Sequence, residues 1–313
     1  MEDAPRVTRI LVTGGTGAVG SYLVPELRSR GYETWVLDRG HHEAKDYIRC
    51  DVGEYRQLEA AIERAEPNLV YHLAAEFGRW NGEAFYETLW RSNVVGNKHL
   101  IRLQERHGFQ VVFFSSSEVY GDWDQVMAED VMDRFEVRQL NDYAISKWVG
   151  ELQHLNAAAM SGTETVRVRL FNTYGPGERY SPYRSALCIF AYRALHGEPF
   201  VVHRGHLRSW TYVEDTARTL ANIAGNFLPG AVYNVAGLEE HSMEDVAKVV
   251  LSATGADASL ADYRESEAFT TRVKHVDVSR AVEDLHHAPS VSLEEGVART
   301  VGWMRSFYGV GAE

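Results

Sequence analysis

Residues 10–20 read ILVTGGTGAVG, and they are the strongest indication of the fold in this sequence. The apolar residues at its start predict a short buried strand, and residues 18–30 predict a helix. Between them, Gly14, Gly17 and Gly20 follow a G-x-x-G-x-x-G spacing. Backbone N–H groups in such a turn can approach a pyrophosphate at a helix N-terminus, because no side chain blocks the approach. Strand, glycine-rich turn and helix in this order predict a dinucleotide-binding unit.

Short apolar runs alternate with helical patterns through the first half of the chain. Residues 54–65 and 89–106 carry apolar residues at helical spacing. Most of the predicted strands are apolar without strict alternation, which is typical of strands covered on both faces. We therefore predict an α/β fold with a Rossmann-type, doubly wound parallel sheet. The predicted strands are residues 8–13, 34–38, 47–50, 68–73, 111–115 and 166–171.

The pattern changes after residue 172, where a segment rich in Gly, Pro and Arg begins. The later elements are expected at 185–196 (helix), 199–203 (strand), 213–225 (helix), 231–235 (a strand that could return to the main sheet) and 243–308 (helix-rich). We expect residues 1–172, with 205–240 returning to them, to form the Rossmann core. Residues 173–204 and 241–313 are expected to form a smaller, helix-rich C-terminal substrate lobe. The two parts would share a crevice at the carboxyl ends of the strands.

Charge and composition narrow the class of protein. The 313 residues carry a formal charge of -12, which disfavours nucleic acid and anionic membranes as partners. Cys50 and Cys188 are too few and too far apart for a disulfide scaffold or a metal cluster. The thirteen histidines show no metal-ligand spacing, so we expect no metal. Because no signal core or membrane-length apolar stretch is present, we expect a soluble, cytoplasmic protein.

The end of the second predicted strand indicates which dinucleotide binds. Asp38 lies 18 residues beyond Gly20, where a carboxylate can accept hydrogen bonds from both ribose hydroxyls of adenosine. This carboxylate would repel a 2′-phosphate, so NAD is favoured, although Arg39 leaves NADP as the alternative. Asp51 and Val52, after the third strand, are expected to border the adenine.

A catalytic pair follows in NDYAISKWVGE (residues 141–151), a predicted helix. Tyr143 and Lys147 are four residues apart, so their side chains share one helix face. An ammonium group near a phenol lowers the pKa of the phenol, and such a tyrosine can remove a hydroxyl proton as hydride leaves the same carbon. By itself, a Y-x-x-x-K pair is usually a surface pair. After a dinucleotide-binding turn, it predicts an oxidoreductase.

Residues 111–122 read VVFFSSSEVYGD, an apolar strand that ends in serines and a glutamate. These side chains are therefore expected at the carboxyl edge of the sheet, where ligands bind in open α/β sheets. Ser116 is expected to hydrogen-bond the reacting hydroxyl beside Tyr143. Glu118 is a candidate general base or acid, with Ser117 beside it. The alternative is a serine-rich loop with a solvated glutamate.

The whole chain resembles the extended short-chain dehydrogenase/reductase family, in its NAD-dependent nucleotide-sugar epimerase/dehydratase branch. The segments that carry the resemblance, in order, are TGGTGAVG, VLD, YHLAA, SSSEVYG, YAISK, LFNTYGPGE, RSWTYVED and SLEEG. The resemblance implies a bound NAD that takes hydride from carbon 4 of a sugar on a nucleotide diphosphate. It makes Tyr143 the base, Lys147 its helper and the holder of the nicotinamide ribose, and Ser116 the hydroxyl partner. Further cofactor contacts are expected from Ala18, Val19, Leu73, Ala74, Ala75 and Asn93.

The same resemblance assigns substrate contacts. Asn172 and Arg208 match family residues that hold the diphosphate, and Arg272 matches a further phosphate-side arginine less closely. Arg79 follows the end of the YHLAA strand and would line the sugar site. Arg179 and Arg184 are added from the basic character of their segment; they would grip phosphate, bind a substrate carboxylate or lie in solvent. By resemblance we also expect a homodimer, with residues 89–106 and 141–160 packed in a four-helix bundle.

The sequence leaves the reaction open. The dTDP-glucose 4,6-dehydratases of the family carry Asp-Glu where this chain carries Ser117-Glu118. The Ser-Glu pair resembles UDP-glucuronate decarboxylases and some UDP-sugar 4,6-dehydratases more closely. We therefore expect a 4-keto intermediate with proton abstraction at carbon 5, in a 4,6-dehydratase or a UDP-uronate decarboxylase. The alternatives are a 4-epimerase, a 4-keto-sugar reductase and a catalytically inactive NAD-binding regulatory protein.

Overall fold

A computed structural model describes residues 8–265, 267 and 269–310. Its centre is a seven-stranded sheet in the order β10-β6-β5-β4-β1-β2-β3, with every neighbouring pair parallel. The strand order reverses between β1 and β4, the place where open α/β sheets bind ligands. The predicted Rossmann-type sheet is confirmed. Its strands are β1 (Arg9–Thr13), β2 (Glu33–Asp38), β3 (Tyr47–Arg49), β4 (Leu69–His72), β5 (Gln110–Ser116), β6 (Thr165–Leu170) and β10 (Val232–Val235).

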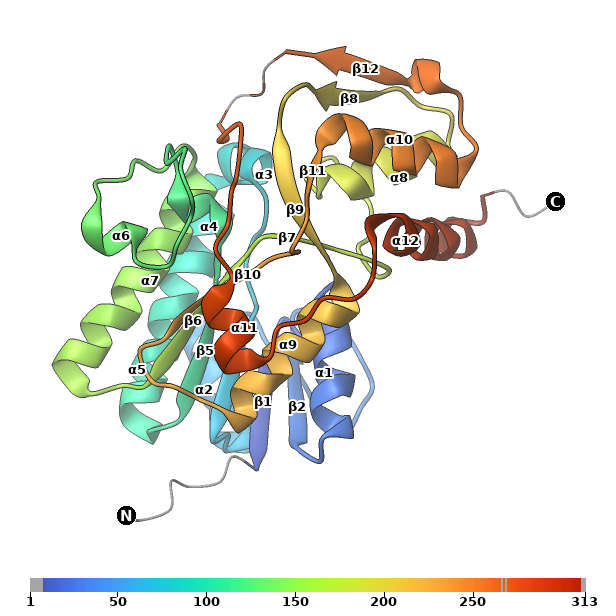
Figure 1. Ribbon diagram of the computed structural model, residues 1–313. Helices are drawn as coiled ribbons and strands as arrows, with labels where there is room; N and C mark the ends of the chain where they lie inside the picture. Colours follow the sequence, from blue (N-terminus) through green and yellow to red (C-terminus); the bar gives the residue numbers. More distant parts are fainter. Residues whose placement is uncertain (1–7, 266, 268, 311–313) are drawn as a thin grey trace.

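Helices cover both faces of this sheet, as a mostly apolar parallel sheet requires (Figure 1). One face packs on α1 (Gly20–Ser29), α9 (Val213–Gly225) and α11 (Ser279–Leu285). The other face packs on α2 (Tyr55–Ala65) and α5 (Asn97–His107), and α7 (Asp142–Ser161) lies along α5. The strands supply both cores by alternation: Ile10 and Val12 face the first group of helices and Leu11 faces the second.

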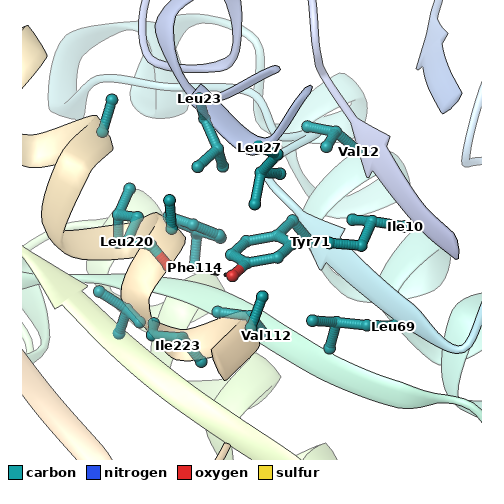
Figure 2. Packing of buried hydrophobic residues seen from close by; sticks show 14 of the residues in the cluster. Ile10, Val12, Leu23, Leu27, Leu69, Tyr71, Val112, Phe114, Leu220 and Ile223 are labelled. Carbon is teal, nitrogen blue, oxygen red and sulfur yellow. Dashed lines mark hydrogen bonds between the residues drawn. The ribbon is translucent and has the colours of Figure 1, made fainter. Parts of the chain in front are cut away.

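Tyr71 of β4 lies at the centre of the first core, surrounded by side chains of α1, α9 and β5 (Figure 2). Its ring is fully buried, and its hydroxyl donates a hydrogen bond of 2.9 Å to the Leu220 carbonyl. A buried phenol needs such a partner, because an unsatisfied hydroxyl would cost free energy in an apolar core. The contact fixes α9 against the sheet.

A smaller lobe packs at one end of the sheet (Figure 1). It contains a three-stranded sheet in the order β11-β9-β7 and a parallel pair, β12-β8. A separate hydrophobic core joins its strands to α8, α10 and α12. The bounds are β7 (Asn172–Tyr174), β8 (Phe200–His203), β9 (Leu207–Tyr212), β11 (Glu240–Ser242), β12 (Ala261–Arg264), α8 (Ala186–Leu195), α10 (Met243–Thr254), α12 (Leu293–Tyr308) and the 3-10 turn η3 (Ala258–Leu260).

The division of the chain differs from the predicted one in two places. The strand β9, in the segment expected to return to the core, pairs with β7 and β11 of the lobe; the elements that do return are α9 and β10. In turn, α11 lies within the expected lobe segment but buries Ala281 and Leu285 in the core of the main sheet. Its short apolar face fits the space between α9 and β10.

The remaining elements lie between β4 and α7. The helix expected over residues 89–106 is divided into the end of α4, a π-helical turn η1 and α5. Such turns are rare and often mark functional sites; this one places Ser92 in the cavity described below. The bounds are α3 (Arg79–Ala84), α4 (Tyr86–Trp90), η1 (Arg91–Gly96), the 3-10 turn η2 (Ser117–Tyr120) and α6 (Val131–Arg134).

Candidate active site

One cavity of about 650 Å³ lies between the carboxyl ends of the strands and the smaller lobe. Residues from both parts line it, including β8, β9 and α8 of the lobe. It brings together most of the residues that the sequence singled out. From the cofactor set they are Gly14, Gly17, Ala18, Val19, Gly20, Asp38, Arg39, Asp51, Val52, Leu73, Ala74, Ala75 and Lys147; from the catalytic and substrate sets they are Ser116, Ser117, Glu118, Tyr143, Arg79, Asn172, Arg184 and Arg208.

The glycine turn is built so that backbone faces the cavity. Gly14 has φ +69°, and a Cβ there would lie 2.8 Å from the Ala74 amide nitrogen. At Gly20 a Cβ would collide with the Gly14 carbonyl oxygen. At Gly17, by contrast, the nearest atom to such a Cβ is the Gly14 carbonyl oxygen at 3.2 Å, so a side chain there would crowd the turn much less. The helix α1 begins at Gly20, so its N-terminal N–H groups lie beside the turn.

Asp38 ends β2 at the edge of this turn, with its carboxylate held in place. Its Oδ2 accepts hydrogen bonds from the Thr16 amide at 3.1 Å and the Thr16 hydroxyl at 2.6 Å, and its Oδ1 accepts one from the Arg39 amide at 2.7 Å. A carboxylate oxygen can accept more than one bond, so Asp38 can still receive ribose hydroxyls. Thr16 was missed by the sequence analysis; its signal is its place inside the glycine turn.

The strand ends next to β1 and β2 complete the cofactor side. The Thr13 hydroxyl accepts a bond from the Ala74 amide at 3.1 Å and lies 2.9 Å from Nδ1 of the buried His72. These contacts fix the loop that carries Leu73, Ala74 and Ala75. The Asp51 carboxylate accepts a hydrogen bond from the Gly53 amide at 2.9 Å, which holds it beside Val52 at the rim of the cavity.

Tyr143 and Lys147 occupy one face of α7, whose N-terminus is capped by the Asn141 side chain. Burial raises the pKa of Tyr143, and a hydrogen bond with Ser116 offsets only part of this rise. The lowered pKa that we predicted for Tyr143 is therefore corrected. The Lys147 ammonium donates a 2.8 Å hydrogen bond to the Phe114 carbonyl, and burial lowers its own pKa to about 8.

The chain matches the NAD-dependent epimerase/dehydratase family over residues 10–236, which is most of its length and includes the glycine turn, Glu118 and Tyr143. The chain belongs to this family. It is an NAD-dependent enzyme, and the expected family and cofactor are confirmed. The cofactor fits the observed geometry, because the turn excludes side chains at Gly14 and Gly20 and Asp38 stands at its edge.

Individual members of this family align with almost the whole chain. A UDP-N-acetyl-alpha-D-glucosaminuronate decarboxylase from Bacillus cytotoxicus is 26% identical over 319 residues, 95% of this chain and 98% of that protein. The solved structure of MoeE5 with UDP-glucuronic acid and NAD is 28% identical, with a TM-score of 0.83, and covers 96% of this chain and 99% of that one. UDP-glucose 4-epimerase from Thermotoga maritima, solved with UDP-glucose, is 25% identical, with a TM-score of 0.85 and coverage of 96% and 99%.

Glu118 of this epimerase/dehydratase family member is paired with a residue that the sequence analysis missed. Its Oε1 lies 2.7 Å from Nζ of Lys274, which is 2% exposed and also donates to the Ser117 hydroxyl at 3.3 Å. The Asn141 amide donates to Oε2 at 3.3 Å. Burial alone would raise the pKa of Glu118, but the charges of Lys274, Arg79 and Arg208 outweigh it and lower this pKa to about 2. Glu118 is therefore a fixed anion.

Arg208 and Arg79 supply positive charge at the substrate end of the cavity. Arg208 lies on β9 and is buried; its guanidinium donates to the Thr271 and Arg272 carbonyls at 2.8 and 2.9 Å. Arg79 begins α3 and forms an ion pair of 2.9 Å with Glu267 across the cavity. Asn172 is the first residue of β7, and its side-chain amide donates to the Ser209 carbonyl at 3.2 Å.

Three predicted site residues do not line the cavity. The Arg179 guanidinium lies over the Phe307 ring, 5.3 Å from its centroid, and the Arg272 Nε donates to the Gly205 carbonyl at 3.3 Å. Asn93 lies behind the wall, where its side chain bonds the backbone of Glu76. Among residues 8–310, leaving out 266 and 268, there is no cluster of His, Cys, Asp and Glu suited to a metal. The same residues include no helix long and apolar enough to cross a membrane.

Proposed function

We propose that this enzyme oxidises carbon 4 of a sugar carried on a nucleotide diphosphate, with Tyr143 as the group that takes the hydroxyl proton. The observation that carries the proposal is a single cavity with the glycine turn at one end and Ser116, Tyr143 and Glu118 at the other. The relatives support the substrate class, because their names specify UDP- and dTDP-linked sugars.

The residues of the chain divide the oxidation step between them. Ser116 holds the substrate hydroxyl beside Tyr143, since its own side chain already hydrogen-bonds that phenol. Because burial raises the pKa of Tyr143, phenolate forms only when positive charge is near. Lys147 contributes such charge from the next turn of α7. When bound, NAD supplies the hydride acceptor and a positively charged nicotinamide ring.

We further propose that the sugar is a uronate. Arg79 and Arg208 line the cavity on the side of Glu118 and are among the charges that lower its pKa. Such cations suit a carboxylate at carbon 6 as well as the diphosphate. Oxidation at carbon 4 makes the uronate a β-keto acid. Its C5–C6 bond then breaks, carbon dioxide leaves with the electron pair entering an enolate, carbon 5 takes up a proton and hydride returns to carbon 4.

Position 117 supports decarboxylation over 4,6-dehydration. A dehydratase must protonate the leaving 6-hydroxyl, and the dehydratases that this chain resembles use an aspartate there. Here a serine occupies the position and accepts a hydrogen bond from Lys274. Decarboxylation needs neither that acid nor a base at carbon 5, so a Glu118 that is ionised at neutral pH is compatible with it. The carbon 5 base expected from the sequence would serve only the dehydratase.

A second candidate is 4-epimerisation. It is favoured by the pairing of both Glu118 oxygens, which leaves this carboxylate poorly placed for any proton transfer. An epimerase needs only the oxidation, a rotation of the keto sugar and the reverse reduction. The similarity to a solved UDP-glucose 4-epimerase agrees with this reading.

One assay separates these reactions. The purified enzyme is incubated with NAD and either UDP-glucuronate or UDP-glucose, and the products are identified by NMR and mass spectrometry. We expect carbon dioxide and a UDP-pentose from UDP-glucuronate. An intact uronate epimerised at carbon 4 would support the second candidate, and a 4-keto-6-deoxy sugar from UDP-glucose would overturn decarboxylation. Inactivity on a broad panel of nucleotide sugars would contradict the whole proposal and favour a regulatory NAD-binding protein.

We propose that two copies associate through α7 and the neighbouring helix. Leu152, Leu155 and Met160 of α7 are 45%, 40% and 78% exposed, and Val95 of η1 is 46% exposed. Apolar side chains gathered on adjacent helices are typical of an interface. Light scattering should give the mass of a dimer, and Leu155→Glu should yield a monomer. A monomeric wild type would contradict the proposal.

We also propose a cytoplasmic location. Cys50 and Cys188 are both buried free thiols, which suits a reducing compartment. Fractionation of cells that make the protein at native level should place it with cytoplasmic markers. Recovery with secreted proteins would contradict this.

A further inference from the structure

An ion pair crosses the cofactor end of the cavity. Arg39 follows β2 and Glu76 follows β4, and their side chains meet at 3.0 Å between Nη2 and Oε1. The strands β2 and β4 flank β1 on either side. The pair therefore bridges the carboxyl end of β1, roughly 10 Å across two strand spacings, where the glycine turn lies. Both residues line the cavity.

One end of this bridge is fixed. The Asn93 side chain accepts a hydrogen bond from the Glu76 amide at 2.8 Å and donates one to its carbonyl at 3.0 Å. The Asn81 amide donates to the second carboxylate oxygen at 3.4 Å. With its backbone and its carboxylate both held, Glu76 is 20% exposed. Asn93, which does not reach the cavity, acts here by positioning Glu76.

The other end is free to move. The Arg39 side chain is 61% exposed, and its backbone is anchored through the amide that donates to Asp38. A long, solvated side chain can release the carboxylate by rotating about its own bonds, without a change in the backbone. Arg39 is thus the mobile half of the pair and Glu76 the stationary half.

We propose that the Arg39–Glu76 ion pair is a strap across the dinucleotide groove, which must open for NAD to enter or leave. This inference rests on NAD binding and does not depend on the sugar reaction. The alternative is that Arg39 only attracts the negatively charged cofactor. Glu76 would then affect cofactor binding only through its own negative charge.

The charge of Glu76 makes the two readings distinguishable. A carboxylate beside the groove repels the pyrophosphate of a dinucleotide. If charge were the only effect of Glu76, replacing this carboxylate with a neutral group would therefore slow cofactor release. Loss of a strap would instead speed cofactor release. In Glu76→Gln, both entry and release of the cofactor should become faster.

The experiment follows release directly. The enzyme is loaded with NADH, an excess of NAD is added in a stopped-flow instrument, and the fluorescence of bound NADH is recorded. Glu76→Gln and Arg39→Gln should each release NADH about two- to fivefold faster, the range expected for an exposed ion pair. Arg39→Gln/Glu76→Gln should be no faster than either single variant, because one broken end already opens the strap. Matched controls are Glu43→Gln and Lys45→Gln, exposed residues of the same charge outside the cavity, which should leave the rate unchanged.

Ionic strength gives a second readout, because salt weakens exposed ion pairs. Release from the wild type should accelerate with salt more steeply than release from the double variant. Slower release from Glu76→Gln, additive effects of the two substitutions or identical salt dependences would each overturn the strap. If the release rates are as expected but the enzyme turns over no nucleotide sugar, the strap stands and only the proposed function is contradicted.

Discussion

At the cofactor end of the cavity the chain presents backbone, whereas at the substrate end it presents charged side chains. Residues 14–20 and Asp38 all belong to the first βαβ unit, and their fit depends on absent side chains at Gly14 and Gly20. The substrate end unites Glu118, Lys274 and Arg208, which come from three distant segments.

This difference shows that the two ends depend on different physical effects. N–H groups at the start of α1 carry partial positive charge and need no compensation inside the protein. Glu118 is a full charge with a side chain only 18% exposed, so it requires the Lys274 ammonium close by. We therefore expect substitutions at the cofactor end to change dinucleotide binding, and substitutions at the substrate end to change turnover or folding.

The largest effect is expected for Tyr143→Phe. Removal of the phenol hydroxyl should lower kcat by about 10²- to 10⁴-fold, the usual contribution of a positioned acid–base group. Bound NAD should remain, because the glycine turn is untouched. Turnover assays measure the loss of kcat, and the absorbance of copurified cofactor shows whether NAD is retained. Tyr86→Phe, at an exposed position, is the control. Unchanged kcat would show that Tyr143 is not the group that takes the proton.

Lys274→Met should strongly destabilise the fold. It leaves Glu118 as a poorly solvated charge without its ammonium partner, which typically costs about 3–5 kcal/mol in the free energy of unfolding. Urea denaturation measures this cost. Lys274→Arg should retain most of the stability, and adding Glu118→Gln to Lys274→Met should recover part of the loss. A loss no larger than that of Lys45→Met, on the surface, would contradict a buried ion pair at the substrate end.

Glu118→Gln should change how stability depends on pH. Folding lowers the pKa of Glu118 from 4.5 to about 2, so its ionisation stabilises the folded state above its ordinary pKa. That contribution is lost as the pH falls from about 4.5 towards 2. The melting temperatures of wild type and Glu118→Gln should differ most near pH 7 and converge under acidic conditions. Curves that stay parallel in calorimetry would refute the lowered pKa.

The smallest effect is expected for Asp38→Asn, at the cofactor end. Loss of the carboxylate should weaken NAD binding about tenfold, as expected for the loss of a single charge-assisted hydrogen bond. The difference in affinity between NAD and NADP should also become smaller. Fluorescence titrations with NAD and NADP measure both affinities, and UDP binding should not change. Asp124→Asn, on an exposed loop, is the matched control. Equal loss of UDP affinity would break the separation between the two ends.

The sequence predicted the cofactor end more completely than the substrate end. The glycine spacing, Asp38 and the Tyr143–Lys147 pair each lie in short segments whose geometry follows from one turn or one helix face. Lys274, by contrast, stands in a stretch of charged residues with no periodic signal, and only the fold brings it to Glu118. Arg179 was expected in the site on basic character and Arg272 on its match to a family phosphate-side arginine, but an aromatic ring and a backbone carbonyl engage them elsewhere.

Local sequence was sufficient to predict the parallel sheet, the glycine turn and the helix that carries Tyr143, because apolar runs, glycine spacing and side-chain periodicity act over a few residues. The packing of distant segments determines which charges are buried together, and it brings α11, but not β9, back to the main sheet. Packing also sets the pKa of Tyr143. Burial raises this pKa, whereas the nearby lysine was expected to lower it. Desolvation and long-range Coulomb interactions depend on the packing of distant segments, and local sequence does not encode that packing.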